Sequence, residues 1–199
     1  MKTKLHSIIY YLLSALLTVF TTGNSTAQIY YWQGFNTMAF PPAQWTMTTV
    51  TGNPIWSSQA NGNNPACTPL EGARMARFFS DQSPAGNTQT LITPVIDYSA
   101  ITANDTARIR LWVFRDTTVG TIGDSLTILV NTTNSLAGAT RIGGVARSVQ
   151  ISLPNTVTAN GWYRYTFDVP GTFNTNTNYL MIQGTSQQGN NIFGRITER

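Results

Sequence analysis

Charged side chains are scarce in this chain of 199 residues, with 12 lysines and arginines against 8 aspartates and glutamates. Aromatic residues make up 11% of the sequence, which together with many β-branched residues excludes an intrinsically disordered chain. The single cysteine, Cys67, excludes an internal disulfide.

The first 27 residues have the pattern of a cleaved signal peptide. Two lysines give a basic start, residues 8–20 are mostly apolar, and Ala27 closes a run of small residues that suits a cleavage site. The apolar run is shorter than the ~20 residues that a membrane-spanning helix needs. We therefore expect export to the medium or the cell surface, a single domain over residues 28–199, and no membrane span in the mature chain.

Cleavage of that segment would remove His6, the only histidine, and both lysines. The mature chain could then form no Ser-His-Asp triad, no Cys-His pair and no histidine-ligated zinc site. Ten arginines and eight carboxylates would remain, a formal charge of +2, with the arginines spread along the sequence. We therefore predict no nucleic-acid binding, which requires a concentrated basic patch. A pair of carboxylates is the enzymatic chemistry left open.

Short strand signals alternate with turn signals along the mature region, and no amphipathic helix stands out. This pattern predicts an all-β sandwich or barrel. Residues 142–145 fit either a loop or a bulged strand. The expected strands cover residues 29–32, 45–50, 74–79, 89–96, 108–115, 126–130, 149–153, 162–169 and 179–183.

The clearest alternation lies in residues 108–115, where aliphatic side chains at odd positions alternate with polar and aromatic ones at even positions. A half-buried strand of a sandwich has this pattern, with one face in the core and the other toward solvent. The expected core face carries Ile109, Leu111 and Val113, and the opposite face carries Arg108, Arg110, Trp112 and Phe114.

The most informative segment is Leu-Ile-Thr-Pro-Val-Ile-Asp-Tyr-Ser at residues 91–99. Pro94 lacks a backbone N–H, so it belongs at a strand boundary or a sheet edge. Aromatic, turn and strand motifs flank this segment in a definite order: Gly34-Phe35, Pro41-Pro42, Trp45 and Trp56 before it, then residues 111–114 and 123–130.

This order resembles the choice-of-anchor J and cleaved-adhesin families, secreted bacterial jelly-roll modules related in shape to MAM domains. The resemblance covers residues 30–193 and implies a jelly-roll β-sandwich of two antiparallel sheets. It also implies a non-catalytic adhesion or binding module whose partner is a glycan or an extracellular or surface protein. Two alternatives stay open: a glycosidase or lyase with a carboxylate pair, and an accessory structural module of a larger surface protein.

Structural calcium is also associated with these families, and calcium takes six to eight oxygen ligands. An acidic residue usually follows the Gly-Phe pair, and an Asp-Asp pair lies near the end. Here Asn36 replaces the early acid and residues 190–195 contain no such pair, which leaves open whether the closing strand is shortened. Asn36 and Asp97 remain as calcium candidates, although Asp97 also fits a turn residue that accepts backbone N–H bonds.

Tryptophan and arginine side chains are the candidates for ligand binding. A sugar-stacking platform could be formed by Trp45, Trp56, Trp112 and Trp162, and burial in the core is the alternative for each of them. Trp32 and Trp56 are the best candidates for exposure, because they lie next to the mature terminus and a loop. Arg108 and Arg110 could hold an acidic ligand through bidentate hydrogen bonds, or they could pair with carboxylates of the protein.

Three Asp-Thr or Asp-Ser sequences resemble an O-glycosylation motif of surface-exporting bacteria. The expected acceptors are Thr106, Thr117 and Ser125, each of which directly follows an aspartate. The motif is short, so chance matches are the alternative.

Overall fold

A computed structural model describes residues 31–53, 56–81, 83–117, 123–147, 156–187 and 192–198. The predicted signal peptide (1–27) and the predicted strand at 149–153 lie outside these ranges. Within them, no helix combines the length and apolar character that crossing a bilayer requires.

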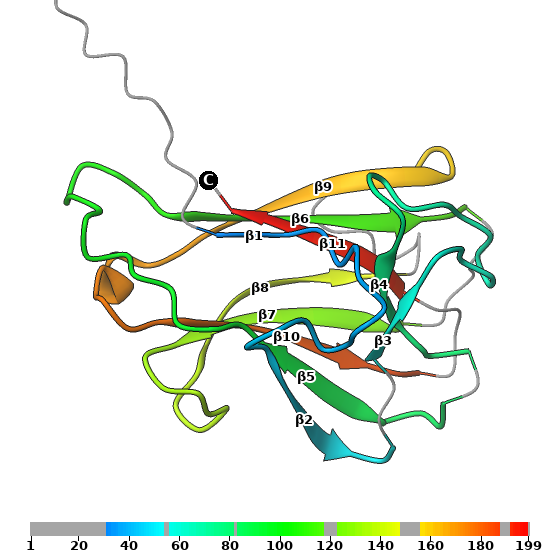
Figure 1. Ribbon diagram of the computed structural model, residues 1–199, viewed down its shortest axis with the longest axis horizontal. Coiled ribbons are helices and arrows are strands. Elements are labelled where there is room, and N and C mark those ends of the chain that lie inside the picture. The colour runs from blue at the N-terminus through cyan, green and yellow to red at the C-terminus, as the bar shows by residue number, and fades with distance from the viewer. Residues whose placement is uncertain are drawn as a thin grey trace, which may run out of the picture.

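Two antiparallel sheets stack as the layers of a β-sandwich (Figure 1). Sheet A, the upper layer in Figure 1, contains β1 (Trp32–Gln33), β3 (Trp56–Gln59), β4 (Met75–Phe78), β6 (Arg108–Arg115), β9 (Gly161–Asp168) and β11 (Ile192–Glu198). Sheet B contains β2 (Thr46–Thr51), β5 (Thr88–Ile92), β7 (Ser125–Asn131), β8 (Thr140–Ala146) and β10 (Tyr179–Thr185).

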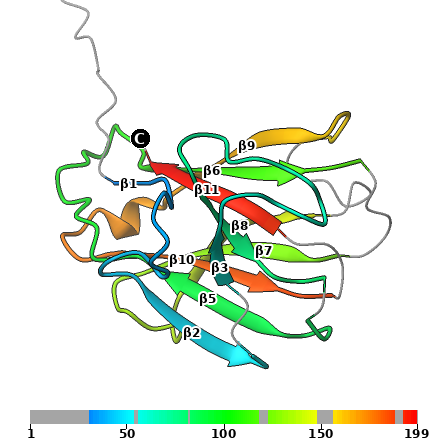
Figure 2. The same ribbon diagram turned by 45° about the vertical axis from the view of Figure 1, so that its right-hand side comes forward.

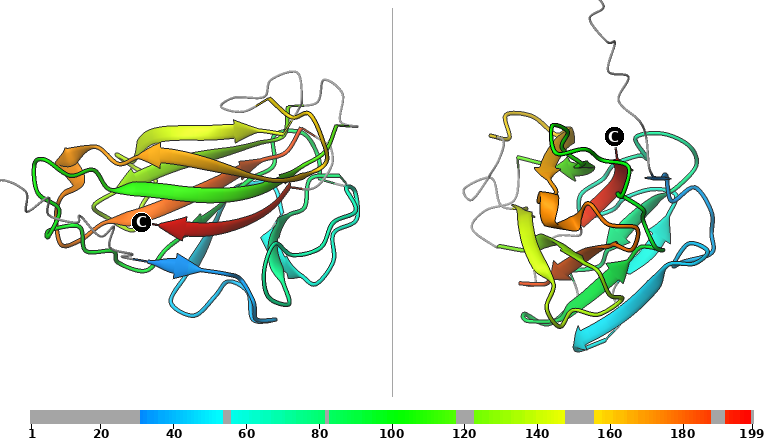
Figure 3. Two further views of the ribbon diagram at one scale, coloured as in Figure 1. Left: turned by 90° about the horizontal axis from the view of Figure 1, so that it is seen from above. Right: turned by 90° about the vertical axis from the view of Figure 1, so that its left-hand side faces the viewer.

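The strand order confirms the predicted jelly-roll sandwich. Sheet A runs β3-β4-β11-β6-β9, with β1 also paired to β11, and sheet B runs β2-β5-β10-β7-β8. Neighbours in each sheet are mostly distant in the sequence, so the chain passes repeatedly between the layers. Figure 2 and the end-on view in Figure 3 show both sheets.

Several strand predictions are confirmed closely. Residues 108–115 form β6 with the expected bounds. The strand expected over residues 89–96 is shorter than predicted, because β5 ends at Ile92, two residues before Pro94. Residues 142–145 belong to β8, and the register between β7 and β8 shifts at Ile128 and Leu129, as expected for a bulged strand.

Two strands were not predicted from the sequence. Trp56–Gln59 forms β3, although it lies between two strong turn signals. The closing strand β11 spans seven residues, Ile192–Glu198, and pairs with β4, β6 and β1. Because β11 lies between β4 and β6, it is a central strand of sheet A.

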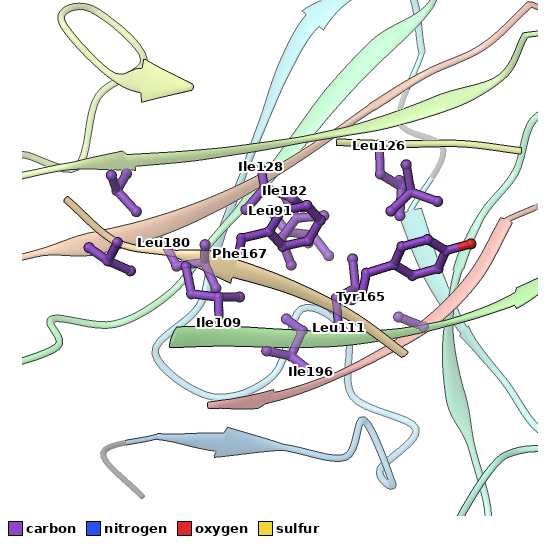
Figure 4. Close-up of a cluster of buried hydrophobic side chains, with 14 of the residues drawn as sticks. Leu91, Ile109, Leu111, Leu126, Ile128, Tyr165, Phe167, Leu180, Ile182 and Ile196 are labelled. Atoms are coloured by element: carbon purple, nitrogen blue, oxygen red, sulfur yellow. The ribbon is translucent and has the colours of Figure 1, made fainter. Parts of the chain in front are cut away.

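The core lies between the sheets and is built from the inward side chains of both (Figure 4). Each fully buried aliphatic side chain stabilises the fold by about 1.5–3 kcal/mol relative to exposure. The predicted inward face of β6 is confirmed, since Ile109, Leu111 and Val113 are all buried. Tyr165 and Phe167 of β9 belong to this core, together with Ile128 and Ile182 of sheet B.

Candidate ligand-binding face

The outward side of sheet A brings arginines and a tryptophan into one row across three strands. Trp112 of β6 is in register with Arg195 of β11 on one side and with Arg164 of β9 on the other. Residues directly opposite each other in antiparallel strands share a face and have Cβ atoms ~5 Å apart. Trp112 is half-buried and Arg164 is exposed. The left panel of Figure 3 looks onto these strands.

One end of this outward side is covered by the connection between β3 and β4. Met75, Phe114 and Phe193 form a small second apolar cluster beneath it, with Trp162 packed at its edge. The indole N–H of Trp162 donates to the carbonyl of Thr68, at 3.1 Å. The connection also reaches the next row, because its Glu71 pairs with Arg195, which stands opposite Trp112 and is only 7% exposed. The open part of the row is therefore on the side of β9, where Arg164 is exposed.

Trp32 closes the open part on the side of β1. Its side chain remains 46% exposed, and the guanidinium of Arg195 lies 5.0 Å from the centre of its ring. Arg195 also pairs with Glu71 from the β3–β4 connection. Cation–π contact and ion pairing together fix the indole at the rim of the face. The prediction that Trp32 is exposed is thus confirmed.

Arg108 and Arg110 share the outward side of β6, as the alternation predicted. Arg108 Nε donates to Asp168 Oδ1 of β9 at 2.8 Å, with both side chains largely exposed. Arg108 therefore pairs with a carboxylate of the protein, which was the alternative to binding an acidic ligand. Arg110 is half-buried and stands opposite Thr166. We name the outward side chains of Trp32, Arg110, Trp112, Arg164 and Arg195 the tryptophan–arginine face.

The expectation that Trp56 is exposed is wrong. Its side chain is 7% exposed and packs against Phe78 with ring centres 5.1 Å apart. The indole N–H donates to the carbonyl of Gln89 at 2.9 Å, and the backbone N–H of Trp56 donates to Oε1 of Gln89 at 2.8 Å. The tryptophan belongs to β3 rather than to a loop, and this places its ring between the sheets.

The two calcium candidates do not assemble a common site. Asp97 is exposed and its Oδ1 accepts the N–H of Ser99 at 2.8 Å, which is the turn geometry that the sequence left as the alternative. Hydrogen bonds from Ser99 lower the pKa of the Asp97 carboxyl. Asn36 lies against Gly72 of the β3–β4 connection. Among the described residues, no group of three or more His, Cys, Asp or Glu side chains could hold a metal ion.

The three predicted O-glycosylation acceptors lie in different surroundings. Thr106 is in an exposed loop, beside the exposed Asp105. Thr117 is exposed, but its Oγ1 donates to Asn160 Oδ1 at 3.1 Å. Ser125 is half-buried at the start of β7. Thr106 is therefore the acceptor with the most accessible surroundings, and its modification stays a prediction.

Two carboxylates are buried together at one end of the sandwich. Asp116 and Asp124 are 1% and 0% exposed, and both charges act on the guanidinium of Arg147. Asp116 pairs with Arg147 at 2.6 Å, and Asp124 Oδ1 accepts the hydroxyl of Ser80 at 2.6 Å. The Asp116–Arg147 pair links the ends of β6 and β8, and thus the two sheets.

Sequence reasoning missed Arg164 and Arg195 as candidate site residues, and it left Trp112 open between sugar stacking and burial in the core. The signal for Trp112 was present, because the alternation in residues 108–115 already places it beside Arg108 and Arg110 and opposite the core face. Arg164 follows from the same rule applied to β9. Arg195 could not be placed, because β11 was not recognised as a strand.

Comparison with solved structures identifies several of similar architecture. The K1 cleaved adhesin domain of Lys-gingipain from Porphyromonas gingivalis aligns with a TM-score of 0.62 and 16% identity, over 85% of this chain and 96% of that domain. The K2 domain gives 0.59 and 16%, over 85% and 97%. This chain has the fold of those cleaved adhesin domains. The predicted resemblance is confirmed at that level, whereas the choice-of-anchor J assignment stays a prediction.

A carbohydrate-binding module has a similar fold. TmCBM61, solved in complex with β-1,4-galactotriose, aligns with a TM-score of 0.51 and 15% identity, over 87% of this chain and 99% of that module. No protein-family model matches the sequence, and no curated protein matches it significantly. These similarities establish the shared β-sandwich.

Proposed function

We propose that the protein is a non-catalytic module that binds a glycan outside the cell or at its surface, through the tryptophan–arginine face. The observation that carries this proposal is the position of Trp112, half-buried on the outward side of sheet A, between the buried Arg195 and the exposed Arg164. Aromatic rings combine a large apolar surface with specific packing geometry, and arginine forks hydrogen-bond to oxygen acceptors. A sugar ring offers both an apolar face and a rim of oxygens.

The compared structures support a binding role. The K1 and K2 domains are adhesin domains by description, and TmCBM61 was solved with a galactotriose. The jelly-roll sandwich is thus a scaffold on which adhesive and sugar-binding surfaces occur. The predicted signal peptide supports export, and a surface protein remains the alternative partner.

Burial of the paired carboxylates favours binding over catalysis. A glycosidase holds two carboxyl groups on either side of a glycosidic bond, in contact with the sugar. Asp116 and Asp124 instead lie inside the sandwich, bonded to Arg147 and Ser80. Their arrangement is that of a structural ion cluster, which supports a module without hydrolytic activity.

A glycan array with the purified protein and three variants tests the proposed function. We expect binding to at least one glycan class and a loss of about tenfold or more in affinity for Trp112→Ala and Trp32→Ala, the size typical of an interface anchor. The matched control is Tyr179→Ala, which removes a half-buried aromatic ring from the outward side of sheet B. A fold check by circular dichroism accompanies each variant. Absence of saturable binding to the array, or an equal loss in Tyr179→Ala, would overturn the proposal.

A further inference from the structure

The exposed indole of Trp32 is fixed by three separate parts of the chain: the turn after β1, strand β11 and the β3–β4 connection. Resting on the glycan-binding function above, we propose that Glu71 and Gly34 are positioning residues of the binding face. Gly34 provides the surface against which the indole lies, and Glu71 holds Arg195 over the ring. Neither residue needs to touch the glycan, because both act through Trp32.

The ring of Trp32 lies directly against the backbone of Gly34. A Cβ atom at Gly34 would be 2.7 Å from Cη2 of the indole, which is closer than non-bonded carbon atoms pack. Continuing the register of β1 and β11 by one residue beyond Gln33 brings Gly34 level with Arg195. The indole therefore extends along β1 toward the row that contains Arg195 and Trp112.

The backbone against which the ring lies is anchored in the core. Phe35, directly after Gly34, is 3% exposed, and its ring packs against that of Trp45 with centres 5.6 Å apart. The N–H of Phe35 donates to Oε1 of Gln33 at 2.8 Å, which holds the turn after β1. Gly34 therefore cannot move away from the indole without disturbing the buried ring of Phe35.

Arg195 makes the second contact with the ring. Its guanidinium carbon lies 5.0 Å from the centre of the Trp32 ring, and the residue is 7% exposed. An arginine that is buried to this extent depends on its counter-ion, because an uncompensated charge is costly away from water. That counter-ion is Glu71. Loss of the carboxylate would therefore release the guanidinium from its place over Trp32.

The β3–β4 connection brings Glu71 to this position. Gly72, the next residue, has a φ of +73°, and a Cβ there would be 2.1 Å from Oδ1 of Asn36. The connection thus contacts the turn after β1 as well as β11. The side chain of Glu71 is 65% exposed, so its removal leaves no cavity in the core.

A ring that is ordered before binding raises affinity, because association then has one side chain fewer to order. The cost of ordering a single side chain corresponds to about two- to tenfold in affinity. Trp32 is 46% exposed, so ring surface that the protein does not cover can pack against the apolar face of a sugar. Substitution of Glu71 or Gly34 should therefore change affinity by an amount of this size.

Relaxation of the Trp32 indole N–H in the ligand-free protein tests the positioning itself. We expect its heteronuclear NOE to match those of the buried Trp45 and Trp56, and to fall in Glu71→Ala. Asp168→Ala is the matched control, because it removes a carboxylate that also pairs with an arginine on the outward side of sheet A. In this control the NOE of Trp32 should be unchanged. Circular dichroism checks the fold of each variant.

Affinity tests the consequence for binding, with β-1,4-galactotriose and the tightest-binding glycan of the array as probes. Glu71→Ala and Gly34→Ala should each weaken binding by about two- to tenfold. In the Trp32→Ala protein, adding Glu71→Ala should cause less than about twofold further loss, since a positioning residue has no effect once the group it positions is absent. Gly171→Ala, whose added carbon meets nothing within 4 Å, is the control for Gly34→Ala.

The outcomes separate this inference from the function on which it rests. A Trp32 indole that is already mobile in the unmodified protein, or equally rigid in Glu71→Ala, would overturn the positioning role and leave glycan binding standing. Independent losses from Glu71→Ala and Trp32→Ala would overturn it as well, because Glu71 would then contact the glycan itself. No saturable binding of the unmodified protein to any array glycan would overturn the glycan-binding function, and the relaxation measurement would still decide whether Glu71 fixes the ring.

Discussion

Arg147 and Asp116 form an ion pair that is buried inside the sandwich. Nη2 of the arginine and Oδ2 of the aspartate are 2.6 Å apart, and the side chains are 0% and 1% exposed. Asp116 follows β6 of sheet A, and Arg147 follows β8 of sheet B. Arg115 adds a second link, because its Nε donates to the backbone carbonyl of Arg147 at 3.1 Å. Burial lowers the pKa of Arg147, and the nearby Asp116 charge raises it.

Removal of one partner should therefore be costly. Asp116→Ala leaves the Arg147 guanidinium buried without its counter-ion, and we expect the free energy of unfolding to fall by about 3–5 kcal/mol. The control is Asp168→Ala, which breaks the exposed pair with Arg108 and should cost about 0–1 kcal/mol. Chemical denaturation of both variants gives the comparison. Equal losses would contradict a buried structural pair.

Gly184 of β10 should resist enlargement. A Cβ at this position would come within 2.3 Å of Cδ2 of Phe78, a fully buried ring. Gly184→Ala forces that ring to move, so we expect a loss of about 1–3 kcal/mol in the free energy of unfolding. In Gly161→Ala the added carbon meets nothing within 4 Å, so this variant is the matched control. Similar stability of the two variants would show that the sheets pack less closely here.

Cys67 should be an unreactive thiol in the folded protein. Burial raises its pKa to about 12, and its Sγ lies 4.0 Å from Sδ of Met75. Alkylation at pH 8 should be slower in the folded than in the unfolded protein by about three powers of ten, since an unfolded cysteine has a pKa of about 8.5. Mass spectrometry of iodoacetamide labelling, with and without denaturant, measures the ratio. Comparable rates would show an accessible thiolate.

Stability should also depend on alkaline pH through this thiol. Because folding raises the pKa of the Cys67 thiol, this group stabilises the folded protein at pH values below its unfolded pKa. That contribution to stability is lost as the pH rises toward the folded pKa. Between about pH 8.5 and 12 the unmodified protein should therefore lose stability relative to Cys67→Ala. Denaturation of both proteins at pH 7.5 and 10 gives the difference, and a constant difference would contradict the raised pKa.

The edge strand β2 should promote self-association. It lies at the end of sheet B, and none of its six residues is charged. Val50 is 51% exposed. Uncharged edges with high β-propensity pair readily with other strands. We expect Val50→Lys to reduce aggregation on heating, measured by light scattering, while Val50→Thr should not. Equal behaviour of the two variants would assign aggregation to another surface.

Much of the fold follows from local patterns in the sequence. The alternation in residues 108–115 specifies both the bounds of β6 and its two faces, and Pro94 correctly lies beyond the end of β5. By contrast, Ile192–Glu198 contains both a glycine and an arginine. Its central place in sheet A depends on pairing with β4 and β6. Pairing between strands that are far apart in the chain produces little recognisable pattern in the sequence of either strand.

The candidate site was only half predictable for the same reason. Exposure of Trp32 and the shared face of Arg108 and Arg110 follow from position and alternation. Trp56 was misplaced because its surrounding turn residues outweighed its own tendency to be buried. The row that joins Arg195, Trp112 and Arg164 requires three strands far apart in the chain to be neighbours, and only the sheet order supplies that information.

Indole N–H signals in a proton–nitrogen NMR spectrum test the binding face most directly, because the chain has only five tryptophans. During titration with a glycan that binds the protein, the signals of Trp112 and Trp32 should shift together. Those of Trp45 and Trp56, buried in the core, should stay in place. A saturating titration would contradict the account if the indole signal of Trp112 stays in place while the backbone amide signals of Tyr179 or Gln183 of sheet B shift.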